Sequence, residues 1–183
     1  MIEIKEIFSK KELKSFVRFP FKLYKNCDAW VPPIIDEELK TLDKDFNPVF
    51  KNAKAHFFLA IKNKKIIGRV AAIINLIEVK EQNIKKIRFG WFDVIDDIEV
   101  TKALLDAVKS VGEKNNLDHI EGPMGFSNLD KVGVVTEGFN HIANMITWHN
   151  YPYYSKHFEQ LGYQIEKGYS ESKMKFENIK PEF

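Results

Sequence analysis

The sequence has few of the features that mark secreted, membrane-spanning or metal-binding proteins. Its 183 residues include a single cysteine, Cys27, which excludes a disulfide within the sequence and a cysteine-rich zinc site. No apolar run approaches the roughly 18 residues that a membrane-spanning helix needs. The opening stretch, MIEIKEIFSKKELK, contains no apolar signal core. We therefore expect a soluble, cytoplasmic protein without a membrane partner.

An excess of one charge is also lacking. The 28 Lys and Arg residues nearly balance the 26 Asp and Glu residues, which gives a net charge of +2. Nucleic-acid-binding domains usually concentrate positive charge, so no nucleic-acid partner is predicted. The five histidines show neither H-x₃-H nor H-E-x-x-H spacing, so no metal site is predicted. We expect Cys27 to be a packed thiol without a histidine partner, and His149 and His157 to be surface or hydrogen-bonded histidines.

Apolar and aromatic residues are plentiful. Hydrophobic residues make up 44% of the chain and aromatic residues 13%, which is enough for a packed core. A chain of this length suits one domain, so residues 1–183 are predicted to form a single domain.

Hydrophobic patterning predicts an α/β fold with a mixed, mostly antiparallel central sheet flanked by helices. Ser9 and Glu12 have the spacing of a capping box and predict the start of a helix, which Pro20 is expected to interrupt or restart. Asn63 and Lys64 predict a turn between two strands. The predicted strands are 2–7, 55–62, 65–79, 86–95, 118–122, 163–169 and 173–176. The further predicted helices are 36–42, 97–116 and 151–161, the last ended by Gly162.

The stretch RFGWFDVIDDIEVTKALLDAVK leads a buried strand directly into an amphipathic helix. The turn between them contains Asp96, Asp97 and Glu99, and no glycine. Asp96 and Glu99 have capping-box spacing, and acidic residues in a first turn suit the helix dipole. We expect the helix to cap itself with these two residues. A cationic ligand, or a phosphate bound in another way, remains the alternative.

Aromatic residues stand beside polar residues in the predicted loops. Loops of this composition often line ligand pockets. Trp30, Trp91, Asn128 and Tyr153 are the predicted substrate-binding residues. With Asp93 at its edge, such an aromatic groove would favour an amine or another cationic group.

The closing segment PYYSKHFEQLGYQIEKGY resembles that of the Gcn5-related N-acetyltransferase (GNAT) superfamily, in which a helix ends in a pattern like Y-x-x-L-G-F. The order of predicted elements fits that fold over nearly the whole chain. The phrases RFPFKLYKNCDAWVPP, NPVFKNAKAHFFLAIKNKKIIGRVAAIIN, RFGWFDVIDD and NYPYY resemble the N-terminal half of a group of bacterial acetyltransferase-like proteins. The resemblance implies an N-acyltransferase that uses acetyl-coenzyme A or another acyl-coenzyme A and a small-molecule amine.

The resemblance also implies roles for individual residues. The strand before the acidic turn would present backbone N–H groups to the thioester carbonyl, so Phe92, Val94 and Ile95 are the predicted cofactor-binding residues. Asp93 is the predicted base, and Tyr154 is the predicted acid.

Two features of the superfamily are lacking. Its Q/R-x-x-G-x-G/A turn holds the pyrophosphate of coenzyme A, but aligning the helix run ALLDA places Asp96, Glu99 and Thr101 at its fixed positions. Phe158 stands four residues before Gly162, where the superfamily often has a tyrosine acid. The alternative is therefore a degenerate, non-catalytic GNAT-like domain that binds a ligand or a partner domain. A homodimer, or docking onto a second GNAT-like domain, is a further alternative.

Overall fold

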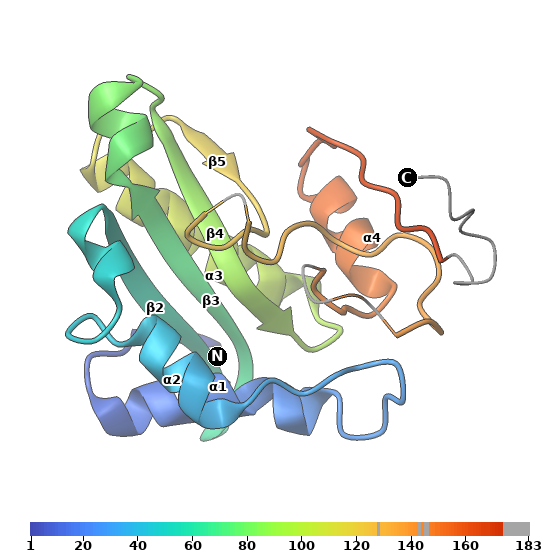
Figure 1. Ribbon diagram of the computed structural model, residues 1–183. Helices are drawn as coiled ribbons and strands as arrows, with labels where there is room; N and C mark the ends of the chain where they lie inside the picture. The colour runs from blue at the N-terminus through green and yellow to red at the C-terminus, as the bar shows by residue number, and fades with distance from the viewer. Residues whose placement is uncertain (128, 143, 145–146, 174–183) are drawn as a thin grey trace, which may run out of the picture.

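A computed structural model describes residues 1–127, 129–142, 144 and 147–173 (Figure 1). A five-stranded sheet with the order β1-β2-β3-β4-β5 forms the middle layer. Neighbouring strands from β1 to β4 are antiparallel, and β5 joins β4 in parallel. The predicted α/β fold with a mixed, mostly antiparallel sheet is confirmed.

The strands are β1 (Glu3–Glu6), β2 (Ala53–Lys62), β3 (Lys65–Asn75), β4 (Lys86–Val94) and β5 (His119–Glu121). The helices are α1 (Lys10–Leu23), α2 (Ile35–Leu42), α3 (Ile98–Lys114) and α4 (Tyr153–Gln160), with a 3-10 turn η1 (Pro48–Lys51) and a π-helical turn η2 (Ile77–Glu81). None of these helices is long and apolar enough to cross a membrane, as far as the described residues extend.

Several local predictions are confirmed. Ser9 and Glu12 form the predicted capping box of α1. Asn63 and Lys64 both adopt positive φ in the turn between β2 and β3, and Gly162 does so after α4. These positions could be identified because each needs a particular side chain or backbone conformation.

The predicted interruption at Pro20 is wrong, because α1 continues through this residue to Leu23. Proline has no N–H to donate to the carbonyl one turn earlier, that of Phe16. The Nη1 of Arg69 donates to the Phe16 carbonyl instead, at 3.0 Å. A side chain from β3 therefore supplies the hydrogen bond that the proline cannot.

Two strand predictions also fail. The strand predicted at 65–79 ends at Asn75, because the Asn75 side chain accepts from the N–H groups of Ile77 and Glu78 and starts η2. The strand predicted at 163–169 is not formed, and residues 170–173 are likewise without regular structure. The rest of the strand predicted at 173–176 lies outside the described residues.

Two hydrophobic clusters lie on the two faces of the sheet. On one face, α3 and α4 pack through side chains such as Leu104 and Tyr154. On the other, α1 and α2 pack through side chains such as Phe16 and Leu42. Alternate residues of a strand point to opposite faces, so each strand contributes to both clusters.

Strand β4 contains one extra residue that changes which face its side chains meet. Arg69 pairs with Asp93 and Ala71 pairs with Gly90, so Trp91 and Phe92 together face the single residue between their partners on β3. Trp91 has a φ of 44°. Because of this β-bulge, the side chains after Phe92 point to the opposite face from the one that simple alternation gives. Asp93 therefore lies on the α1 side of the sheet, beside Arg69, rather than on the α3 side.

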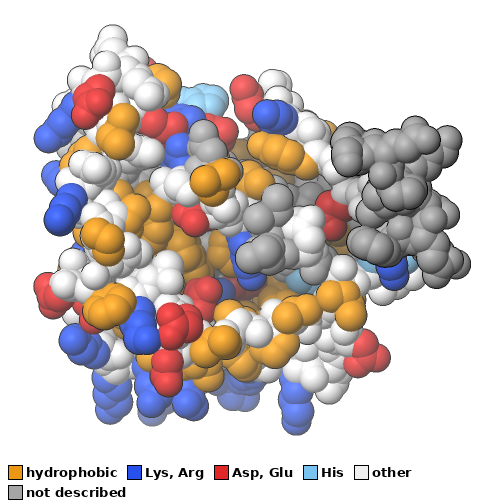
Figure 2. Space-filling model, in the orientation of Figure 1, with side chains coloured by type: hydrophobic (Ala, Val, Ile, Leu, Met, Phe, Trp, Pro, Cys, Tyr) orange, Lys and Arg blue, Asp and Glu red, His pale blue; other side chains and the backbone are white. Residues whose placement is uncertain are grey.

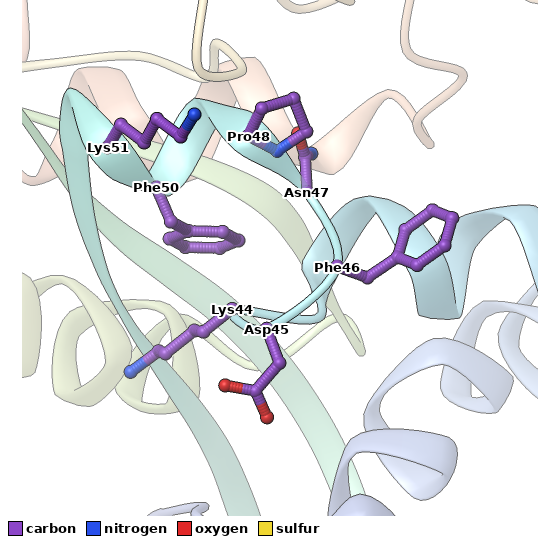
Figure 3. A pocket seen from close by; sticks show the side chains of 7 residues that line it. All are labelled: Lys44, Asp45, Phe46, Asn47, Pro48, Phe50 and Lys51. Carbon is purple, nitrogen blue, oxygen red and sulfur yellow. The ribbon is translucent and has the colours of Figure 1, made fainter.

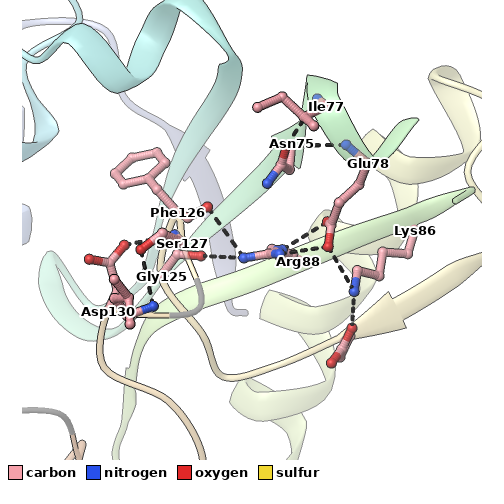
Figure 4. A network of polar contacts seen from close by, with 11 residues as sticks. Asn75, Ile77, Glu78, Lys86, Arg88, Gly125, Phe126, Ser127 and Asp130 are labelled. Carbon is pink, nitrogen blue, oxygen red and sulfur yellow. Dashed lines mark hydrogen bonds and ion pairs between the residues drawn. The ribbon is translucent and has the colours of Figure 1, made fainter. Parts of the chain in front are cut away.

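A buried ion network fixes the other end of β4 (Figure 4). The Arg88 guanidinium contacts both oxygens of Glu78, at 3.0 and 2.6 Å, and donates to the carbonyls of Gly125 and Phe126. Lys86 pairs with Glu78 at 3.0 Å. Burial opposes ionisation of Glu78, but its hydrogen bonds to Arg88 and Lys86 outweigh burial and lower its pKa. The network ties η2 and the chain after β5 to β4.

The close approach of that chain to β4 gives a first prediction. A Cβ at Gly90 would lie 2.3 Å from the carbonyl oxygen of Met124, which is backbone and cannot rotate away. We expect Gly90→Ala to lower the free energy of unfolding by about 1–3 kcal/mol. Gly168→Ala, with nothing within 4 Å, is the matched control and should change it by less than about 0.5 kcal/mol. Urea unfolding measures both, and equal effects would contradict the prediction.

Candidate functional site

A chain of buried hydroxyl groups lies at the end of β4. The Val94 N–H donates to the Tyr154 hydroxyl at 2.9 Å, and that hydroxyl lies 3.0 Å from the Tyr24 hydroxyl. Tyr24 in turn donates to Oδ1 of Asp93 at 2.9 Å. The chain therefore joins α4, α1 and β4 at the point where β4 ends.

The direction of the hydrogen bonds follows from the number of protons. Each tyrosine hydroxyl has one proton, and Tyr24 gives its proton to Asp93, so Tyr154 donates to Tyr24. The donors then run in one order, from Val94 through Tyr154 and Tyr24 to Asp93. Hydrogen bonds aligned in this way polarise and strengthen one another.

Asp93, the predicted base, is held by ion pairing. Its Oδ2 accepts from both Nε and Nη2 of Arg69, each at 2.7 Å, and its Oδ1 accepts from Tyr24. Its exposed fraction is 5%. Arg69 and Tyr24 therefore occupy both Asp93 oxygens, and Tyr24 connects the carboxylate to Tyr154.

Both tyrosines of the chain resist ionisation. Burial raises the pKa of Tyr154 well above its usual value, and the nearby Asp93 carboxylate raises it further. Burial and the same carboxylate also raise the pKa of Tyr24. At neutral pH both hydroxyls therefore stay protonated, so Tyr154, the predicted acid, retains a proton to donate.

The backbone of Val94 is contacted by two tyrosines. Tyr154 accepts from its N–H, and Tyr153 donates to its carbonyl at 2.6 Å. Strand β5 pairs only with Lys86 to Arg88, so α4 rather than β5 lies beside this end of β4 (Figure 1). The two hydroxyls satisfy the backbone groups that a longer β5 would have bonded.

The other predicted cofactor-binding residues are less accessible. The Ile95 N–H already donates to the Ile67 carbonyl of β3. The Phe92 ring packs against Tyr154 and Phe158 on the α3 side of the sheet. The Val94 N–H instead donates to the Tyr154 hydroxyl. A ligand atom could bind this N–H by replacing that hydroxyl.

The predicted substrate-binding aromatics form two sets. Trp30 stacks on Tyr24 at 5.3 Å, and rings in contact continue through Tyr151 to Tyr153. Trp91 lies on the α1 side of the sheet, where its ring contacts Phe126 and Trp148 at 5.3 and 5.6 Å. Asn128 lies outside the described residues. Hydrophobic side chains also gather in a hollow near the middle of the face shown in Figure 2.

The acidic turn caps α3, but not in the predicted way. The N-cap is Asp97, whose side chain accepts from the Glu99 N–H at 3.1 Å, so the predicted capping box of Asp96 and Glu99 is wrong. Asp96 instead pairs with Nε2 of His157 at 3.2 Å, and Nδ1 of His157 lies 2.9 Å from Oγ1 of Thr101. The buried His157 of α4 therefore covers one side of the acidic turn.

Cys27 has a histidine partner, contrary to the prediction. Its Sγ lies 3.1 Å from Nε2 of His149, although the two residues are 122 positions apart. The His149 ring meets the Tyr24 ring edge-on at 5.4 Å. The pair therefore adjoins the hydroxyl chain. In the sequence, the one sign of this contact is that both residues stand beside aromatic motifs.

A surface hollow of about 360 Å³ lies away from this site, between α2 and β2 (Figure 3). Its lining includes Lys44, Asp45 and Phe50, and the charged ends of Lys44 and Asp45 point away from the Phe50 ring. Nothing in its lining belongs to the predicted site.

The buried tyrosines predict a loss of stability at high pH. Because the folded protein raises their pKa above 10, their stabilisation is complete below about pH 10 and is lost as the pH rises further. Tyr154→Phe leaves the Val94 N–H unpaired and should cost about 1–3 kcal/mol at pH 7. Its stability should then fall less steeply than that of the wild type at alkaline pH.

Urea unfolding from pH 7 to pH 11 measures both effects. Tyr169→Phe, at an exposed tyrosine, is the control and should follow the wild type throughout. Parallel curves for the wild type and Tyr154→Phe would contradict the assignment of a raised pKa to Tyr154.

The chain is similar in sequence to parts of two longer curated proteins. No family model matches the chain. It is 30% identical over 160 residues to Protein YghO of Escherichia coli K12, covering 87% of this chain and 41% of that protein. It is 28% identical over 153 residues to the bacterial ceramide synthase of Caulobacter vibrioides, covering 83% and 40%. The chain thus spans about two fifths of the length of these curated relatives.

Two solved structures match nearly from end to end. One is a predicted acetyltransferase of Clostridium acetobutylicum with acetyl-coenzyme A, with 12% identity, a TM-score of 0.55, and coverage of 94% of this chain and 96% of that one. The other, from Pyrococcus furiosus and also a predicted acetyltransferase, has 14% identity, a TM-score of 0.54, and coverage of 95% and 100%. With the arrangement of sheet and helices described above, these likenesses show that the chain has a GNAT-like fold.

Proposed function

We propose that this domain transfers an acyl group from an acyl-coenzyme A to an amine. The main supporting observation is the hydrogen bond from the Val94 N–H to the protonated Tyr154 hydroxyl. It lies at the end of β4 that β5 does not pair with. A backbone donor and a proton donor at one place are what thioester aminolysis requires. The relative named ceramide synthase supports an amine acceptor, because a ceramide is an amide of a fatty acid and an amino alcohol.

Each group of the site then has a task. The Val94 N–H would bind the carbonyl oxygen and stabilise the negative charge that develops on it. Tyr154, displaced from that N–H, would donate its proton to the leaving sulfur. Tyr24, Asp93 and Arg69 would hold the tyrosine oriented, because their hydrogen bonds run in one direction. Coenzyme A, when bound, supplies an activated thioester.

The two ends of acyl-coenzyme A fit this chain unequally. The acyl end would meet an N–H and a hydroxyl. The phosphates would approach the start of α3, where Asp97 already caps the helix and Asp96 and Glu99 add negative charge. A carboxylate about 4 Å from a phosphate costs about 1 kcal/mol even in bulk water. We therefore expect the coenzyme to bind less tightly than it would at a turn without these carboxylates.

A second candidate is a non-catalytic domain that binds a ligand or a partner domain. It is favoured by the same contacts at Val94, because both backbone groups already have partners in Tyr153 and Tyr154. Under this hypothesis the tyrosines close the site permanently, and the acidic turn has no phosphate to meet.

Binding and transfer distinguish the two candidates. We expect titration calorimetry to give a roughly micromolar dissociation constant for palmitoyl- or acetyl-coenzyme A. We also expect transfer to sphinganine or to a simpler primary amine, with kcat falling about 100-fold or more in Tyr154→Phe. Tyr169→Phe is the matched control. An absence of binding heat at millimolar ligand would support the non-catalytic alternative.

The acidic turn gives a separate prediction. Glu99→Gln removes one negative charge where the phosphates would lie, and we expect it to tighten coenzyme A binding about fivefold, equivalent to about 1 kcal/mol. Glu113→Gln makes the same change in charge near the other end of α3 and should leave the affinity unchanged. Equal affinities for both variants would mean that the phosphates lie away from this turn.

A further inference from the structure

The proposed transfer needs a group that takes a proton from the amine, and Asp93 is poorly placed for this. Its Oδ2 is held twice by Arg69 and its Oδ1 by Tyr24. The two tyrosines of the hydroxyl chain are protonated at neutral pH, since burial raises their pKa. Another base must therefore lie close to these groups and reach the solvent.

His149 is in such a position. It is half-buried rather than enclosed, and its ring lies 5.4 Å from Tyr24 and 6.3 Å from Tyr151. Tyr24 is the hydroxyl neighbour of Tyr154. The imidazole is thus one residue removed from the proposed proton donor, on the partly exposed side of the cluster.

Cys27 contacts one of the two ring nitrogens of His149. Nε2 lies 3.1 Å from Sγ of Cys27. We take Nε2–H to donate to the sulfur, the tautomer that places the lone pair of the neutral ring on Nδ1. Nδ1 has no hydrogen-bond partner in the described part of the chain.

The surroundings keep this ring neutral. The groups facing it are the Cys27 thiol, the Tyr24 and Tyr151 rings, and the Asp93 carboxylate at longer range. Burial lowers the pKa of His149 from its usual 6.5, and Asp93 opposes the shift only in part. At pH 7 the imidazole is therefore able to accept a proton.

We propose that His149 is the catalytic base that takes the proton from the attacking amine, and that Cys27 is a positioning residue that orients its ring. The inference rests on the proposed acyl transfer and completes it. The amine nitrogen bonds to the carbonyl carbon while the carbon–sulfur bond breaks. The amine proton passes to Nδ1 of His149, and the departing thiolate takes the proton of Tyr154. The imidazolium then gives its proton to solvent, and Tyr154 regains one from water once the products have left the site.

Steady-state kinetics of the full chain, with palmitoyl-coenzyme A and sphinganine, test this assignment. We expect His149→Gln to lower kcat about 100-fold or more with little change in KM. The decline of kcat/KM toward acidic pH in the wild type should be absent from the variant. Added imidazole should partly rescue His149→Ala, which a merely structural role would not allow. His141→Gln, an exposed histidine of the same loop region, is the control and should match the wild type.

Substitutions at Cys27 separate the two roles of the pair. Cys27→Ser keeps an acceptor for Nε2–H and should retain kcat within about threefold, whereas Cys27→Ala should lose several-fold. A covalent acyl group on Cys27 in mass spectra, with activity abolished in Cys27→Ser, would overturn the assignment and make the thiol the nucleophile.

A measurement without substrate keeps the outcomes distinct. Cys27 is the sole cysteine of the sequence, so its alkylation by iodoacetamide reports on this site alone. His149→Gln should change the pH dependence of alkylation, and His141→Gln should not. An active wild type with unaltered kinetics in His149→Gln would overturn the role of His149 alone. A wild type that neither binds nor transfers the acyl group would overturn the proposed function and this inference together.

Discussion

The arrangement of this domain depends on one extra residue in β4. Because Trp91 and Phe92 together occupy the space opposite one residue of β3, every side chain after them faces the opposite side from the one that simple alternation predicts. Asp93 is thereby placed against Arg69 and α1. Without the bulge, the carboxylate would point into the apolar layer beneath α3, where burying an unpaired charge is prohibitively costly.

The Arg69–Asp93 ion pair stabilises both helix α1 and the hydroxyl chain of the site. Arg69 satisfies Asp93 with two of its nitrogens and the carbonyl that Pro20 leaves unpaired with a third. Asp93 in turn accepts from Tyr24 near the end of α1. A buried guanidinium is favourable only when nearly all of its donors are used, and this one links a strand, a helix with an internal proline and a tyrosine. The helix and the site therefore share one set of interactions.

Local signals in the sequence predicted most elements of the fold and little of the site. Ser9 with Glu12, and Gly162, each encode a feature within a few residues. The bulge left no trace, since the residues from Phe89 to Val94 are buried on both faces and show no alternation. Tyr24 and Asp93 are 69 positions apart and Cys27 and His149 are 122 apart. Contacts of this range depend on packing that no short pattern records.

The direction of the hydroxyl chain has a consequence for ligand entry. The donors run in one order, from the Val94 N–H of β4 to Tyr154 of α4, then to Tyr24 and back to Asp93 of β4, so an oxygen atom arriving at the Val94 N–H would need to replace one acceptor only. The hydrogen bonds from Tyr154 through Tyr24 to Asp93 would keep their order as the oxygen binds, and the Tyr154 proton would leave Tyr24 only when it passes to the sulfur. A carbonyl oxygen could then replace the Tyr154 hydroxyl at the Val94 N–H without disturbing the Arg69–Asp93 ion pair.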